Sequence, residues 1–154
     1  MKNLNLFLKE SNKIEGVLDD ISLKNAHKAW EFIAKERYMT REAILQTHRI
    51  LMANHLSGDD LGHFRTCEVT IGGKRALPSF LVPHLISDWY QRVNGDKNWQ
   101  DVKESHIRFE KIHPFIDGNG RVGRIFMSWG LVRLGLPIKV ILDKNKQMYY
   151  NMFL

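Results

Sequence analysis

The sequence predicts an all-α domain that carries one small β-hairpin. Apolar residues recur at helical spacing through most of the 154 residues, and only residues 65–83 show the alternation and turn residues typical of strands. With 44% hydrophobic residues, the chain is long and apolar enough to bury a core of its own. No linker, internal repeat or low-complexity tract divides it, so we expect residues 1–154 to form a single domain.

Two amphipathic helices are expected before the hairpin. One runs from about residue 23 to residue 37, with one face formed by Leu23, Ala26, Trp30, Ile33 and Ala34. Thr40 can cap the next, which places His48 and His55 on or beside its buried side. Histidines in such positions usually make structural hydrogen bonds in the core or cap a helix, so we assign neither of them a catalytic role.

The hairpin is predicted from a short alternating segment followed by a glycine pair. The alternating residues are Val69, Thr70 and Ile71, and the pair Gly72-Gly73 suits a tight turn. Pro78 and Pro83 close the segment. A plain surface hairpin is the simplest interpretation of this pattern.

Three further helices are expected after the hairpin, in addition to one discussed below with its motif. The first follows Pro83 and ends at Asn94-Gly95, and its apolar face is Leu85, Ile86, Trp89 and Val93. The second runs from about Trp99 into His113. The third spans about residues 146–154 and carries Tyr149 and Tyr150.

Residues 113–124 read His-Pro-Phe-Ile-Asp-Gly-Asn-Gly-Arg-Val-Gly-Arg and combine the groups that phosphate chemistry requires. His113 can accept a proton near neutral pH. Asp117 offers a hard oxygen for Mg²⁺, which is usually held by one or two carboxylates and by substrate phosphates. A tight turn whose backbone N–H groups converge on an anion is expected at Gly118, Asn119 and Gly120.

A helix is expected to begin directly after this turn. Its apolar stripe is Val122, Ile125, Phe126, Trp129 and Val132, so a bound phosphate would lie at a helix N-terminus. Arg121 and Arg124 lie off that stripe and point within roughly 60° of each other, so both could reach one polyphosphate.

This run resembles the signature of the Fic family, His-Xaa-Phe-Xaa-Asp/Glu-Gly-Asn-Gly-Arg-Xaa-Xaa-Arg, and every fixed position is met. The resemblance implies the Fic fold, a helical bundle with a β-hairpin flap over the active site. It also implies an enzyme that transfers AMP from ATP to a hydroxyl side chain of a target protein. In that family the flap pairs with an extended piece of the target, a role that would fall here on residues 69–73.

The resemblance also implies a role for each motif residue. His113 would be the catalytic base, and Asp117 would hold Mg²⁺ between the α- and β-phosphates of ATP. Arg121 would hold the β-phosphate and Arg124 the γ-phosphate, which stabilises the departing pyrophosphate. The α-phosphate would be bound by Gly118, Asn119 and Gly120. Tyr149 and Tyr150 would help to wall the adenine pocket.

A second motif near the start of the chain resembles the inhibitory motif of the same family. Residues 11–16 read Ser-Asn-Lys-Ile-Glu-Gly, against Ser/Thr-Xaa-Xaa-Xaa-Glu-Gly/Asn, and the resemblance implies an inhibitory helix over about residues 4–17. If this segment is helical, Ser11 and Glu15 share a face, and Glu15 can pair with Arg124 in place of the γ-phosphate. Gly16 completes the motif. The same carboxylate could instead position water to remove AMP from a modified target, and the sequence leaves both activities open.

Parts of the sequence would also fit two functions of other classes. A zinc hydrolase would use His106, Glu110 and His113, which share one helical face, but the helix would end at Pro114 and the glycine loop would be left unused. A nucleic-acid-binding protein would fit the net charge of +6, but acidic residues interrupt the basic ones throughout. We expect neither.

The remaining features concern the surroundings of the protein. No segment suits a signal peptide or a membrane span, and the single cysteine, Cys67, fits a reducing cytoplasm. We therefore expect a cytoplasmic enzyme that needs ATP, Mg²⁺ and a target protein. The identity of that target, the preferred nucleotide and the presence of a homo-oligomer stay open.

Overall fold

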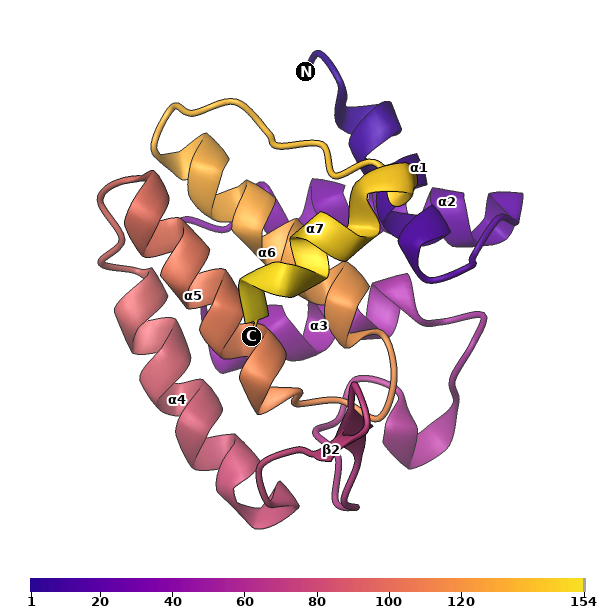
Figure 1. The fold of residues 1–154 in the computed structure, drawn as a ribbon, viewed down its shortest axis with the longest axis vertical. Helices are drawn as coiled ribbons and strands as arrows, with labels where there is room; N and C mark the ends of the chain where they lie inside the picture. The colour runs from indigo at the N-terminus through magenta and orange to yellow at the C-terminus, as the bar shows by residue number, and fades with distance from the viewer. Residues whose placement is uncertain (154) are drawn as a thin grey trace.

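The computed structural model describes residues 1–153, which form a helical bundle with one two-stranded sheet (Figure 1). The seven α-helices are α1 (Leu4–Ile14), α2 (Asp20–Ile33), α3 (Arg41–Leu51), α4 (Val82–Val93), α5 (Trp99–Ile112), α6 (Asn119–Arg133) and α7 (Lys146–Tyr150). Short 3₁₀ turns lie at Gly58–Asp60, Ser79–Leu81, Asp143–Asn145 and Asn151–Phe153. The expected all-α class with a small hairpin is confirmed.

Helix α6 lies in the middle of the bundle, with α4 and α5 on one side and α1 and α2 on the other (Figure 1). Most of its residues are buried, including both arginines of the motif. A helix enclosed on all sides in this way is held in place by every neighbour. The phosphate motif, which spans the end of α5 and the start of α6, is therefore held by several neighbouring helices.

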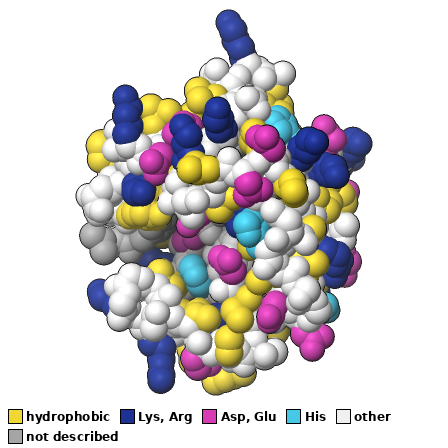
Figure 2. Space-filling view, turned by 90° about the vertical axis from the view of Figure 1, so that its right-hand side faces the viewer, with side chains coloured by type: hydrophobic (Ala, Val, Ile, Leu, Met, Phe, Trp, Pro, Cys, Tyr) yellow, Lys and Arg dark blue, Asp and Glu magenta, His cyan; other side chains and the backbone are white. Residues whose placement is uncertain are grey.

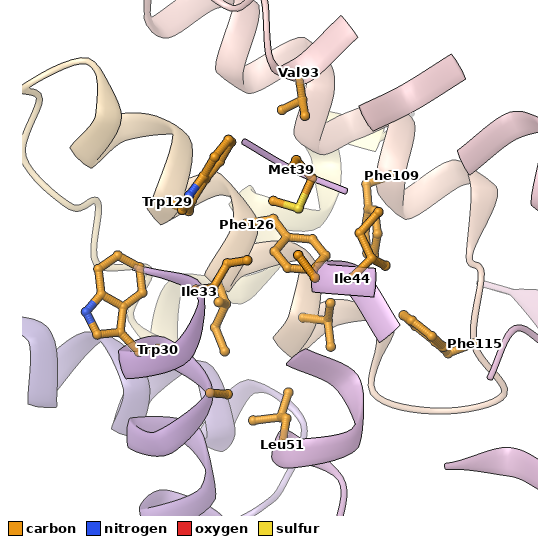
Figure 3. Close-up of a cluster of buried hydrophobic side chains, with 14 of the residues drawn as sticks. Trp30, Ile33, Met39, Ile44, Leu51, Val93, Phe109, Phe115, Phe126 and Trp129 are labelled. Atoms are coloured by element: carbon orange, nitrogen blue, oxygen red, sulfur yellow. The ribbon is translucent and has the colours of Figure 1, made fainter. Parts of the chain in front are cut away.

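One apolar core joins α1 to α6. Phe7 of α1, Trp30 of α2 and Trp129 of α6 all belong to it, and Figure 3 shows its aromatic centre. The rings of Phe109 and Phe126 meet edge to face with their centroids 5.4 Å apart, which is the geometry that their quadrupoles favour. The N-terminal helix is thus an integral part of the same core as the motif helices.

Side-chain caps begin three of the helices. The Asp19 carboxylate accepts from Ser22 N–H at 2.8 Å, Thr40 Oγ1 accepts from Ala43 N–H at 3.1 Å, and Asn98 caps α5. The cap predicted at Thr40 is confirmed. The cap at Asp19 starts α2 three residues earlier than the sequence pattern indicated.

Several predicted helix ends were wrong. The helix expected over residues 23–37 ends at Ile33, and the one expected over residues 4–17 ends at Ile14, where Gly16 with φ 71° reverses the chain. Helix α3 ends at Leu51, so His55 is exposed and bonds Ser22 instead of facing the core. The helix expected over residues 146–154 is α-helical to Tyr150 and continues as a 3₁₀ turn over Asn151–Phe153, and Leu154 lies outside the described residues.

The hairpin forms where it was predicted. Strands β1 (Thr70–Ile71) and β2 (Lys74–Arg75) pair antiparallel around Gly72-Gly73, whose φ angles of 54° and 79° suit a primed hairpin turn. Val69 lies outside the strand, although its carbonyl accepts from Ala76 N–H at 2.9 Å. None of the helices in residues 1–153 is both long and apolar enough to cross a bilayer.

Candidate active site

The loop between α5 and α6 is shaped by its own side chains. Asn119 accepts a hydrogen bond from Phe115 N–H and donates one to Phe115 O, both at 2.8 Å. Phe115 is fully buried, and its ring stacks on the His48 ring with centroids 3.8 Å apart. The Asn119 side chain is therefore occupied by the loop, and what it can offer a phosphate is its backbone N–H at the start of α6.

His48 supports the same loop through its contacts with Asp117 and Phe115. Its Nδ1 accepts from Gly62 N–H at 2.9 Å, so its Nε2 donates to Asp117 O at 2.9 Å. Burial lowers the pKa of His48 to about 4, so the ring is neutral at physiological pH. This is the structural role in the core that the sequence suggested.

His113 caps the end of α5 and turns its ring into the site. Its backbone is left-handed, with φ 51° and ψ 62°, which is unusual for a residue with a side chain. Nδ1 lies 3.3 Å from Glu110 O, so Nδ1 is the donor and Nε2 is left to accept a proton. Partial burial lowers the pKa of His113, which keeps the imidazole in its basic form near neutral pH.

Arg65 holds this turn against the base of the hairpin, a role that no sequence pattern indicated. Its guanidinium donates to the carbonyls of His113 at 2.7 Å, Leu77 at 2.6 Å, Cys67 at 3.1 Å and Ile112 at 3.3 Å. Its backbone N–H also donates to Pro114 O. Because all these acceptors are main-chain atoms, no motif of side chains could have revealed the role.

The turn from Asp117 to Gly120 leads into the N-terminus of α6. Gly118 has φ 88°, a conformation that residues with side chains rarely adopt, and a Cβ there would press on the Met52 side chain. Asp117 is exposed and accepts from Gly118 N–H through Oδ1 at 2.7 Å. The first N–H groups of α6 have no acceptors within the helix, so they can bind an anion.

Arg124 is fully buried and holds the end of α1. Its Nε donates to Ser11 Oγ at 2.8 Å, and its Nη2 donates to Ser11 O at 3.0 Å and to Glu15 Oε1 at 2.7 Å. The Glu15 carboxyl lies against Gly120, where any side chain would collide with it. The expected pairing of Glu15 with Arg124 is thus present, although Glu15 follows the helix instead of belonging to it.

Arg121 is also buried but is left with unused donors. Its Nη2 contacts Met52 Sδ at 2.9 Å, whereas Nε and Nη1 have no hydrogen-bond partner among residues 1–153. An enclosed cation with free donors is costly unless a ligand completes it. Both arginines are covered by neighbouring segments, which the helical pattern alone did not indicate.

Glu110 is an acidic residue of this site that was expected from the sequence only as a possible zinc ligand. It lies against Gly123, its Oε1 is enclosed, and that oxygen has no hydrogen-bond partner among residues 1–153. Burial raises the pKa of Glu110 to about 8, against the influence of nearby Arg124. No group of three or more metal ligands occurs in the described chain, and His106 is bonded instead to Tyr149 OH at 2.7 Å.

Several of these groups line a cavity of about 460 Å³. Its wall includes His113, Gly120 and Arg124 from the motif, Glu15 from the end of α1, and Tyr149 and Tyr150 from α7, and strand β2 with its neighbours closes one side. Asp117 and Arg121 lie outside this wall. Figure 2 shows histidine and acidic side chains around a hollow on one face of the molecule.

Comparison with known proteins gives consistent relatives. A sequence model described as the Fic/DOC family matches residues 38–131. "Protein adenylyltransferase Fic" of Aedes aegypti is 29% identical over 92% of this chain, and its namesake in Drosophila mojavensis is 27% identical over the same share. The chain spans only 28% of the length of each.

Solved structures show the same fold. A Fic domain containing signaling protein from Bacteroides thetaiotaomicron superposes with a TM-score of 0.84 at 21% identity, over 97% of this chain and 70% of that one. Fic-1 from C. elegans, as residues 134–508, gives a TM-score of 0.82 at 20% identity, over 97% of this chain and 54% of that one.

Proposed function

Because the chain belongs to the Fic/DOC family, we propose that it is a protein adenylyltransferase, which transfers AMP from ATP to a hydroxyl side chain of a target protein. Its longer relatives carry that name, and the activity is proposed here for the region that they share with this chain. The observation that supports it most is that His113 and Arg124 line one cavity at the N-terminus of α6.

His113 is proposed to act as the general base. Since Nδ1 is oriented by Glu110 O, Nε2 can take the proton from the target hydroxyl as its oxygen bonds to the α-phosphorus of ATP. The bond from that phosphorus to the bridging oxygen of the β-phosphate then breaks, and pyrophosphate leaves. The protonated imidazole releases its proton after the transfer.

The charge of the triphosphate is proposed to rest on the start of α6. The backbone N–H groups of Gly118, Asn119 and Gly120 suit the α-phosphate. The two nitrogens of Arg121 that find no partner in the described part of the chain suit the β-phosphate. Arg124 would bind the γ-phosphate. The backbone N–H groups and Arg121 are held by the bundle before the reaction begins, so little reorganisation of these donors accompanies the transfer.

Asp117 is the residue that would hold Mg²⁺. Its carboxylate is exposed at the turn from Asp117 to Gly120, and Oδ1 accepts the bond from Gly118 N–H, which leaves Oδ2 for a metal ion. One such carboxylate suits Mg²⁺, which usually takes one or two. When bound, Mg²⁺ would neutralise charge on the phosphates.

Inhibition by the N-terminal segment is part of the proposal. Glu15 occupies Arg124 with a 2.7 Å ion pair, and Ser11 takes two further donors of the same guanidinium. ATP could then enter only without its γ-phosphate at Arg124, in an unproductive position. Removing the carboxylate of Glu15 should therefore raise the activity.

The outer wall of the cavity is proposed to recognise the base and the target. Tyr149 and Tyr150 would contact adenine, and the hairpin with Val69 to Gly73 would pair with an extended segment of the target. We also propose that residues 1–154 act as one domain in the cytoplasm, where the exposed Cys67 would stay reduced.

The experiment compares wild type, Glu15→Gly and the double variant Glu15→Gly with His113→Ala. Each is incubated with ATP labelled on the α-phosphate, Mg²⁺ and cell lysate, and labelled proteins are separated by electrophoresis. We expect labelled bands with Glu15→Gly, weak bands with wild type and none with the double variant. A lysate pre-labelled by Glu15→Gly, freed of enzyme and then treated with wild type, tests removal of AMP by the same site.

Nucleotide binding provides the control. The double variant should still bind Mg²⁺-ATP in calorimetry, because His113 acts on the target hydroxyl and not on the phosphates. If Glu15→Gly neither labels any protein nor binds Mg²⁺-ATP, the proposed activity is wrong.

A further inference from the structure

The N-terminal helix is attached to the protein in two different ways. Its first half is anchored by Phe7 and Leu8, which are fully buried in the main core. Its last turns, residues 10–15, bury Ile14 and also contact the rest of the chain through the polar side chains of Glu10, Ser11 and Glu15. Two of these residues, Ser11 and Glu15, end on the same guanidinium, that of Arg124.

Glu10 makes a polar contact that does not involve Arg124. Its Oε2 accepts a hydrogen bond from Asp143 N–H at 2.9 Å, and its Oε1 accepts one from Lys13 Nζ at 3.0 Å. The side chain is only 12% exposed although it is charged. The Asp143 N–H holds the pKa of this carboxyl below its ordinary value, with a further contribution from Lys13, so Glu10 is ionised at neutral pH.

Asp143 begins the turn that leads into α7. Figure 1 shows this turn passing beside α1 before α7 crosses in front of the bundle. Tyr149 and Tyr150 of α7 wall the same cavity that Glu15 enters from α1. The bond from Glu10 to Asp143 therefore joins the two segments that carry these lining residues, and it does so without involving Arg124.

We propose that Glu10 is a positioning residue, which clamps the end of α1 to the Asp143 turn and thereby keeps Glu15 over Arg124. This inference rests on the proposed function and adds a second determinant of the inhibition. When a triphosphate competes for Arg124, both Ser11 and Glu15 lose their partner. The clamp at Glu10 stays intact, so it returns the carboxylate to the site and sets how often the site is open.

The size of the effect follows from the type of bond. A hydrogen bond to a charged, enclosed acceptor typically shifts a two-state equilibrium by about tenfold or more. Glu10→Ala should therefore raise AMP transfer by about tenfold over wild type. In the Glu15→Gly background the same change should leave the rate at saturating ATP unaltered, because the clamp acts only through Glu15.

Two matched variants separate the clamp from other effects of the substitution. Glu10→Gln keeps an oxygen that can accept from Asp143 N–H, so it should restore most of the inhibition. Lys13→Met removes the ion pair with Glu10 but leaves the bond to Asp143, and it should behave as wild type. Cooperative thermal unfolding of each variant confirms that the fold is intact.

Hydrogen exchange tests the clamp without any nucleotide. In Glu10→Ala, the amides of residues 11–16 should exchange about tenfold faster than in wild type, whereas those of α5 should not change. Unchanged exchange at residues 11–16 in Glu10→Ala would overturn the inference, whatever the activity. Two results on activity would also overturn it: AMP transfer by Glu10→Ala at the wild-type rate while Glu15→Gly is active, or activation by Glu10→Gln equal to that by Glu10→Ala. An inactive Glu15→Gly would instead count against the proposed function.

Discussion

Replacing Glu110 with glutamine is expected to stabilise the protein at neutral and alkaline pH but not near pH 4.5. The carboxyl is enclosed against Gly123, and burial raises its pKa to about 8 from the ordinary value of 4.5. Below pH 4.5 the group is protonated in both the folded and the unfolded chain. As the pH rises from 4.5 to 8, the unfolded chain ionises first, so the folded protein loses stability.

The magnitude follows from the two pKa values. Each pKa unit corresponds to about 1.4 kcal/mol, so the free energy of unfolding of wild type should fall by about 3 kcal/mol between pH 4.5 and pH 7 through this group. Glutamine has nearly the same volume and cannot ionise. The stability of Glu110→Gln relative to wild type should thus increase by about that amount over the same range.

Urea denaturation at 25 °C, followed by circular dichroism at several pH values, measures the difference directly. The midpoint of Glu110→Gln should move upward relative to wild type with each step from pH 5 to pH 8. A constant difference between the two proteins across that range would refute the reasoning, because it would mean that Glu110 ionises equally well in the folded chain.

Two further predictions concern stability at the same site. Burial lowers the pKa of His48 to about 4 and that of His106 to about 3, so the unfolded chain binds protons first below pH 6.5. Each histidine should therefore lower the free energy of unfolding by about 2 kcal/mol at pH 5. In denaturant titrations, His48→Gln should weaken this dependence on acid. The added methyl of Gly123→Ala would collide with the Glu110 carboxyl, so this variant should have a lower melting temperature than wild type. Gly130→Ala is the control, because its methyl meets Val102 at an ordinary distance of 3.4 Å and should leave the melting temperature unchanged. Equal melting temperatures for the two variants would contradict the close packing at Gly123.

The features that the sequence predicted well are those encoded by neighbouring residues. The turn at Gly72-Gly73 and the cap at Thr40 depend on local backbone preferences, so short patterns identified them. The pairing of Glu15 with Arg124 was also expected, although 109 positions separate the two residues, because each lies in a motif of its own. Helix ends were less accurate, since caps such as Asp19 compete with apolar periodicity.

The features that the sequence missed depend on where the main chain of distant segments lies. Arg65 donates to four carbonyls, and any residue type could supply a carbonyl. Likewise, the environment of Glu110 results from the approach of α5 to α6 at Gly123, and a glycine within a helix does not reveal which side chain will fill its space. The phosphate role expected for Asn119 stays a prediction, and the sequence did not reveal that its side-chain amide closes the loop on Phe115.

The left-handed backbone of His113 links reactivity to the way in which α5 ends. A residue with a side chain adopts this conformation only when its surroundings impose it, here through the carbonyl bond to Arg65 and the anchored ring of Phe115. The direction in which the imidazole points is therefore set by the backbone conformation at this turn and not by a flexible rotamer. Changes that relax this corner, even far from the cavity, would redirect the base while the helices themselves stay folded.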